Sequence, residues 1–417
     1  MRSQQGGWLI SDRPTKRLVI STLLLLLAGS IPAAAQSNSP ASSCVLSAGS
    51  NRQPNEGFTD YILHLRPSSK LQAVMVFVDF SDAPQSESTE ALYTSLVPNS
   101  VRWFEEVSYG RMSLEVRAVH KWYRMPKISN TYGFGWKRPA LTFEGHRSYI
   151  ADAIALSDKD VDYSQYQILF VVASNGAALP ESPAFHAYPG RGILVDGTEI
   201  RHASTFGNDV RDPGRNRGSH ILIHELGHLI GLPDIHDWQS FGLLNRKHSG
   251  GWDVMSSNNT GAHFFAWNKW KLGWLDPNQI RCVLGSFETI EETITPLETR
   301  GGLKAVVIPV SASRAYVVEV RQKIGFDTDL CDSGVLIYSV DASARNGTGP
   351  IRVSSLNGGK DFDKIKNCDV LYDAPFDVGP AEIATFDDAD ANLTIEVVSK
   401  SESSYKVKIR RQNPTSP

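Results

Sequence analysis

The run from Ser219 to Asp234 constrains the fold of this 417-residue chain more than any other stretch. Ser219 is a natural N-cap, and apolar residues recur at helical spacing from there to Ile230. Gly231, followed closely by a proline, ends the pattern. The sequence therefore predicts an amphipathic helix that stops abruptly and turns, so that side chains on the helix and side chains just after the turn lie close together.

Two histidines and a glutamate lie on this predicted helix. His224 and His228 are four residues apart, so their side chains project from one face about one turn apart, within reach of a single Zn²⁺. Glu225 follows the first histidine directly. In a catalytic zinc site with three protein ligands, a carboxylate takes a proton from the water that attacks a carbonyl. The pattern predicts His224 and His228 as zinc ligands and Glu225 as the general base.

The residues after the helix extend this pattern. The chain matches H-E-x-x-H-x-x-G-x-x-(H/D), in which the glycine lets the backbone turn and deliver a third ligand, here Asp234. His236 is the alternative third ligand, and Asp237 is expected to accept a hydrogen bond from a ligand histidine. Met255 follows His228 by 27 residues. A methionine in a tight turn at this place is expected to pack beneath the metal without binding it.

The first 35 residues predict a secretory signal peptide. Basic residues precede the apolar run Leu18–Ile31, and three alanines follow, with cleavage expected near Ala35. The apolar run is about 14 residues long, short of the roughly 20 that span a bilayer, so we expect no stable membrane anchor. Loss of this segment changes the formal charge from -3 to -6, which does not favour nucleic acid or an anionic membrane as a partner. The chain is expected to be secreted.

All four cysteines follow the predicted signal peptide, where an oxidising compartment favours disulfides. No C-x-x-C spacing indicates a cysteine metal site or a redox site. Of the three connectivities, we favour Cys331 with Cys368, because both fall in one downstream segment, which leaves Cys44 for Cys282.

The remaining pattern predicts an α+β fold. Residues 36–70 are rich in Ser, Pro and Gly and are expected to be flexible. Residues 71–277 alternate strand and helix signals, whereas residues 278–411 carry short strand-like runs that indicate a β-sandwich, before a tail at 412–417. The expected strands are 73–80, 114–122, 167–173, 305–310, 316–322, 334–340, 393–398 and 405–409, with an edge strand at 193–200; the expected helices include 92–107 and 149–156.

Three sequons occur, Asn258-Asn-Thr, Asn346-Gly-Thr and Asn392-Leu-Thr. We interpret their asparagines as ordinary turn residues. The aromatic residues of 264–274 have helical spacing and are expected to form core next to the zinc site.

Several stretches beyond the zinc motif resemble the immune inhibitor A family of secreted bacterial metallopeptidases. They cover most of residues 70–340. The stretches are Val76–Asp82, Phe104–Leu114, Trp252–Ser256, Ala262–Leu275 and Val318–Asp327.

The resemblance implies a zincin-like catalytic domain with a Met-turn, followed by a β-rich C-terminal domain. It implies His224, His228 and Asp234 as ligands of one catalytic Zn²⁺, Glu225 as general base, and protein or peptide substrates. Family members usually carry tyrosine where this chain has His236, and they often bind structural Ca²⁺, for which no ligand is assigned here. The alternative function is an extracellular adhesion or binding protein that retains a non-catalytic metalloprotease-like domain. His263 and Tyr188 are the candidates for a group that polarises the substrate carbonyl.

Overall fold

The computed structural model describes residues 40–48, 54–67, 70–134, 141–211, 217–240, 242–285, 287–355, 368–380 and 382–411, with residues 360, 363 and 366. The expected signal peptide and the tail at 412–417 lie outside these residues. None of the helices in the described part of the chain has the length and apolar character needed to cross a membrane. Strands and helices alternate in the first half of the chain, and strands dominate the second half. The described residues form several sheets, which confirms the α+β class.

The first sheet has the strand order β2-β1-β3-β7-β4. Neighbouring strands are parallel except for β4, which runs antiparallel to β7 at one edge. The strands are β1 (Lys70–Asp79), β2 (Ser113–Arg124), β3 (Ile168–Ala173), β4 (Ala184–His186) and β7 (His202–Phe206).

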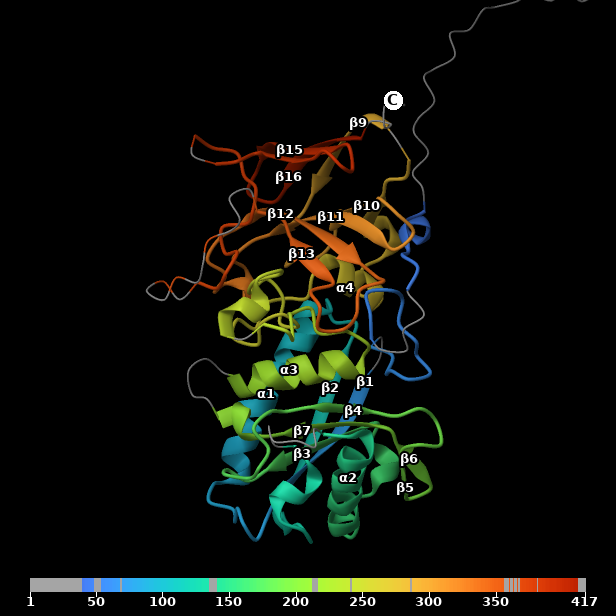
Figure 1. The fold of residues 1–417 in the computed structure, drawn as a ribbon, viewed down its shortest axis with the longest axis vertical. Helices are drawn as coiled ribbons and strands as arrows, with labels where there is room; N and C mark the ends of the chain where they lie inside the picture. Colours follow the sequence, from blue (N-terminus) through green and yellow to red (C-terminus); the bar gives the residue numbers. More distant parts are fainter. Residues whose placement is uncertain are drawn as a thin grey trace, which may run out of the picture. The chain divides into compact units, whose positions relative to one another are not determined.

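Strand β1 is apolar from Ala73 to Val78, where both faces of this sheet are covered. Its alternate side chains divide between two cores, as the two-residue period of a strand requires. Met75 and Phe77 belong to the core that includes α1 (Thr89–Val107) and α3 (Arg217–Leu229). Val76 and its neighbours on the other face pack with α2 (Phe143–Ser157). Figure 1 shows α3 and α2 on opposite sides of this sheet.

Two further sheets make up the C-terminal part. One has the order β13-β12-β11-β10-β8 and the other the order β14-β15-β16-β9, and side chains from both form one core. The strands are β8 (Ile280–Cys282), β9 (Phe287–Ile294), β10 (Ala305–Pro309), β11 (Arg314–Arg321), β12 (Gly334–Asp341), β13 (Ile351–Val353), β14 (Thr385–Asp388), β15 (Leu393–Lys400) and β16 (Tyr405–Arg411).

The five-stranded C-terminal sheet, β13-β12-β11-β10-β8, is also covered on its other face, by the region that carries α3. Val307, Val317 and Tyr338 project from that face into the same core cluster as α1, α3 and the short helix α4 (Ala266–Lys271). The boundary expected near residue 277 therefore falls inside a shared core. The aromatic side chains of 264–274 are buried in that core, as expected.

The described residues of the expected flexible segment, 40–48 and 54–67, are packed against the rest of the protein. Cys44 is bonded to Cys282, and Leu65 N–H donates to the carbonyl of Leu229 at the end of α3. Trp267 Nε1 donates to the carbonyl of Glu56, 3.1 Å away. Composition predicted flexibility for these residues, and it gave no sign of their contacts with residues more than a hundred positions away.

Local boundaries also differ from the expectations. Helix α3 begins at Arg217, so Ser219 is inside the helix and is not its N-cap. Residues 193–200 form a separate hairpin, β5 (Ile193–Val195) with β6 (Thr198–Ile200), whereas the edge strands of the first sheet are β2 and β4. Strand β7 was not expected. Both favoured disulfides are confirmed, Cys44–Cys282 and Cys331–Cys368.

Candidate metal centre

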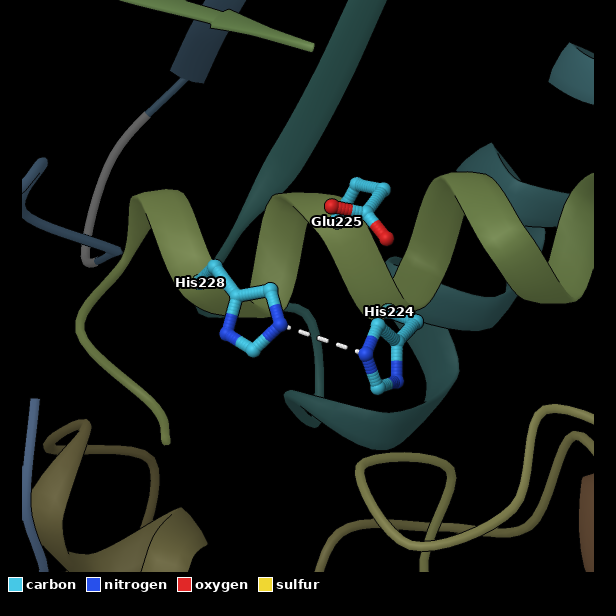
Figure 2. A group of neighbouring side chains, drawn as sticks. All are labelled: His224, Glu225 and His228. Atoms are coloured by element: carbon cyan, nitrogen blue, oxygen red, sulfur yellow. Dashed lines mark hydrogen bonds between the residues drawn. The ribbon is translucent and has the colours of Figure 1, made fainter. Parts of the chain in front are cut away.

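Helix α3 brings the two motif histidines together. His224 and His228 lie one turn apart, and both imidazoles project from one side of the helix (Figure 2). Their Nε2 atoms are 3.2 Å apart. One ligand atom from each of His224, Glu225 and His228 lies within 4.8 Å of the others. The helix alone thus supplies two nitrogen donors that face one point.

Asp234 completes a tighter triangle than Glu225 does. Its Oδ1 lies 3.1 Å from Nε2 of His224 and 3.4 Å from Nε2 of His228. Ligand atoms about 2.0–2.2 Å from a tetrahedral Zn²⁺ are separated from each other by about 3.3–3.6 Å. The three distances of 3.1, 3.2 and 3.4 Å are close to that separation. The spacing of these two imidazole nitrogens and one carboxylate oxygen is thus compatible with one face of a tetrahedral metal site.

Backbone carbonyls orient both imidazoles. Nδ1 of His224 lies 2.9 Å from the carbonyl oxygen of Val254, and Nδ1 of His228 lies 2.9 Å from that of Leu232. A carbonyl can only accept, so each Nδ1 carries the proton and each Nε2 keeps its lone pair for a metal. The role expected for Asp237 is thus filled by carbonyl groups. The Asp237 carboxylate instead pairs with Lys247 Nζ at 2.7 Å.

Charges in the site favour a cation. The Asp234 carboxylate, outweighing the opposing effect of burial, raises the pKa of both His224 and His228. The two imidazoles in turn hold the pKa of Asp234 well below its usual range, again against burial. All three side chains are almost fully buried. A buried carboxylate needs a positive partner, and a divalent ion held by these three side chains would supply it.

Glu225 is buried next to this triangle, and its carboxylate is bound by strand β4. Burial raises the pKa of its carboxyl well above the usual range, while His224 and a hydrogen bond from the backbone of Ala184 in β4 lower it. A raised pKa makes a carboxylate a stronger proton acceptor near neutral pH. Glu225 therefore lies beside the triangle of His224, His228 and Asp234, with a carboxylate whose affinity for a proton is raised by burial.

Strand β4 presents an open backbone edge close to Glu225. Thr205 N–H donates to the carbonyl of Pro183, and Ala187 N–H donates to that of Arg201. Because alternate residues bond to the partner in an antiparallel pair, the intervening Ala184 directs its backbone groups away from β7. Among the described residues, β4 is the last strand of its sheet on this side.

His236 lies beside the triangle. Its Nδ1 is 3.5 Å from Oδ1 of Asp234 and 3.4 Å from the carbonyl oxygen of Met255. The ring centroid of His236 lies 6.2 Å from that of His224, whereas the centroids of His224 and His228 are 4.8 Å apart, so the geometry favours Asp234 over His236 as third partner of the two imidazoles. His263 is elsewhere, fully buried against Lys269 Nζ at 2.9 Å, and Tyr188 is exposed on the surface.

The turn around Met255 packs against α3, next to His224 and Gly227. Asp253, fully buried, accepts the backbone N–H groups of Met255 and Phe265, each at 2.7 Å, and this holds the turn closed. The carbonyl of Val254 in the same turn orients His224. Met255 is itself buried, and a Cβ built on Gly227 of α3 would come within 2.5 Å of its Sδ. The methionine therefore lies directly against the helix, next to His228.

Substitution of Gly227 by alanine tests this contact. Overpacking against Met255 is expected to cost about 1–3 kcal/mol, of which the better helix propensity of alanine returns about 1 kcal/mol. Met255→Ala alone should cost about 2–5 kcal/mol. Because the added methyl enters the space that the thioether leaves, the double variant should be more stable than the sum of the two losses predicts, as measured by urea unfolding. Additive losses would contradict the contact.

Asn346 is the residue at this site that sequence reasoning missed. Its Oδ1 accepts the backbone N–H of Asp234 at 2.6 Å. Its only signal was the Asn-Gly-Thr tripeptide, which predicted a turn and gave no link to a residue 112 positions away.

Comparison with models of protein families gave no match to this chain. Comparison with curated proteins also gave no match.

Proposed function

We propose that this protein is a secreted zinc-dependent endopeptidase. The observation that carries the proposal is the triangle of His224 Nε2, His228 Nε2 and Asp234 Oδ1, with separations of 3.1–3.4 Å, beside the buried carboxylate of Glu225. His224, His228 and Asp234 would hold one Zn²⁺. When bound, the metal would supply a Lewis acid for the scissile carbonyl and lower the pKa of water.

The residues of this chain would perform the remaining tasks. Glu225 would take the proton of the attacking water and later pass it to the leaving amine, for which its raised pKa is suited. The N–H of Ala184 is already bound by Glu225. The edge of β4 would pair with the substrate in an extended conformation through the carbonyl of Ala184 and the backbone of His186, because an edge strand can add a peptide as a further strand. Such backbone pairing favours protein or peptide substrates over small esters or sugars.

The fold and the cysteines support the same proposal. We infer a zincin-like catalytic domain followed by a sandwich-like C-terminal region, in keeping with the resemblance to the immune inhibitor A family. The two disulfides agree with an extracellular location, since such bonds persist outside the cytosol. Structural Ca²⁺ remains part of what the resemblance implies, with no ligands assigned.

The test is hydrolysis of casein by the purified chain, with zinc content measured on the same sample. We expect one bound zinc per chain, loss of hydrolysis on treatment with a chelator, and recovery when Zn²⁺ is added back. A chain with bound zinc that leaves casein and a panel of unfolded proteins intact would support the alternative, an extracellular binding protein. A chain that binds no zinc would overturn the proposal.

A further inference from the structure

A loop from the C-terminal sheets reaches the candidate metal ligand Asp234. The β12–β13 loop, residues 342–350, joins β12 to β13 in the five-stranded sheet. Asn346 Oδ1 accepts the N–H of Asp234 at 2.6 Å, and the N–H of Gly347 donates to the carbonyl of Asp234 at 3.1 Å. Both backbone groups of Asp234 are thus bound by one loop, which comes from more than a hundred residues further along the chain.

The same loop is fastened to the residues that follow Asp234. Trp238 N–H donates to the carbonyl of Gly347 at 2.9 Å, and Asp237 forms an isolated β-bridge with Thr348. Gly347 has φ +68°, and a Cβ there would lie 2.1 Å from the Trp238 ring. The tip of the loop, residues 346–348, therefore packs against residues 234–238.

The base of the loop is also held. Asp341 N–H donates to the carbonyl of Pro350, and Val353 N–H donates to the carbonyl of His248. The loop is consequently anchored to its own sheet at one end and to the metal-binding segment at the other.

Asp234 has little support of its own. It lies in a segment without regular secondary structure after α3. Its neighbour Ile235 donates its N–H to the carbonyl of Met255, at the longer distance of 3.3 Å. A carboxylate oxygen must lie within a few tenths of an ångström of its place to bind zinc well, and groups that orient ligands typically change metal affinity 10- to 100-fold.

We propose that Asn346 is a positioning residue of the metal centre, through which the β12–β13 loop sets the affinity of the site for zinc. The inference rests on the proposed function, since it takes Asp234 as a ligand. Asn346 does not touch the metal. Its amide oxygen holds the Asp234 backbone so that the carboxylate faces the two imidazoles before the ion arrives.

The experiment measures the dissociation constant for Zn²⁺ by competition with a chromogenic chelator, on the full chain. Asn346→Ala is expected to weaken zinc binding by about 10-fold or more. Asn346→Asp keeps an acceptor oxygen at the same place and adds negative charge, so its zinc affinity should equal or exceed that of the wild type. Asn346→Ser, with a shorter polar side chain, should fall between, and it replaces the alanine variant if that one does not fold.

Asn392→Ala is the matched control. Asn392 is the asparagine of another sequon, at φ +48° in the turn between β14 and β15, so alanine there strains the backbone without touching the metal segment. We expect a lower melting temperature and an unchanged zinc affinity. If Asn346→Ala behaves like this control, its role is structural only and the inference is overturned.

Asp234→Ala separates this inference from the proposed function. If the wild type binds no zinc, or if Asp234→Ala leaves the zinc affinity unchanged, the proposed function fails and the inference fails with it. If Asp234→Ala abolishes tight binding while Asn346→Ala matches the wild type, the inference alone is wrong. Weakened binding in both, restored in Asn346→Asp, supports it.

Discussion

Glu225→Gln is expected to lower kcat for peptide hydrolysis by about 10²- to 10⁴-fold while zinc binding stays intact. The amide has the size of the carboxylate and still offers an oxygen to the backbone of Ala184, but it cannot accept a proton at neutral pH. Zinc should be retained because the closest ligand triangle is made by His224, His228 and Asp234. The measurements are steady-state hydrolysis of a casein-derived peptide and zinc content per chain.

Stability provides an internal control for this variant. Burial raises the pKa of Glu225 well above its usual range, so the charged carboxylate is costly to bury. Replacement by neutral glutamine should therefore leave the melting temperature equal or higher. Activity above a tenth of the wild-type value would contradict the role of Glu225 as general base. Loss of zinc from a folded variant would show that Glu225 is a ligand, and the assignment of Asp234 would then be wrong.

Arg321→Met is expected to lower the free energy of unfolding by about 3–5 kcal/mol. The guanidinium is fully buried in β11 and contacts three carboxylates, Glu298 at 3.2 Å, Glu319 at 3.1 Å and Asp327 at 2.7 Å. Its charge, outweighing burial, lowers the pKa of Asp327 to about 2. Without Arg321, these carboxylates lose the guanidinium that contacts all three, and the nearby Lys269, whose pKa burial lowers to about 7, compensates them only in part.

The carboxylates around Arg321 also hold the start of α4. Asp327 accepts the backbone N–H of His263 at 2.9 Å, and Glu319 accepts that of Ala266 at 2.7 Å. These residues follow the Met255 turn directly along the chain. We therefore expect Arg321→Met to lower the stability of the region that carries α3 and of the C-terminal sheets together, in one transition.

Urea unfolding followed by tryptophan fluorescence and by circular dichroism would test this. The matched control is Arg410→Ala, which removes an arginine whose partner Glu396 lies 3.5 Å away with both side chains exposed. Such a surface pair contributes at most about 1 kcal/mol. Equal effects of the two variants would show that the buried network adds no net stability. Two separate transitions in Arg321→Met would show that the regions unfold independently.

Local chemistry along the chain was enough to predict the centre of the site. A four-residue spacing on a helix places two side chains on one face whatever surrounds it, so His224 and His228 could be paired from sequence. A glycine that ends the helix brings the following residues back, which placed Asp234 near them. The apolar runs predicted most of the long strands for the same reason, since the two-residue period of a strand is also local.

The surroundings of the site depended on contacts between distant residues. The open edge of β4, the carbonyl of Val254 that orients His224, and Asn346 behind Asp234 are brought in by sheet order and loop packing. None has a local signature, because a backbone carbonyl or a turn asparagine looks the same in any loop. The order of residues 54–67, which composition predicted to be flexible, has the same origin.

Helix periodicity and a helix-ending glycine act over a few residues, so the residues alone were enough to predict that His224, His228 and Asp234 lie together with Glu225 beside them. The groups that orient these side chains, and the contacts between the first sheet's region and the C-terminal sheets, became visible only in the folded chain. Arg321 illustrates the difference: its three carboxylate partners are near in sequence, but their burial comes from packing the five-stranded sheet against α4. Burial turns an ordinary cluster of charges into an interaction of several kcal/mol.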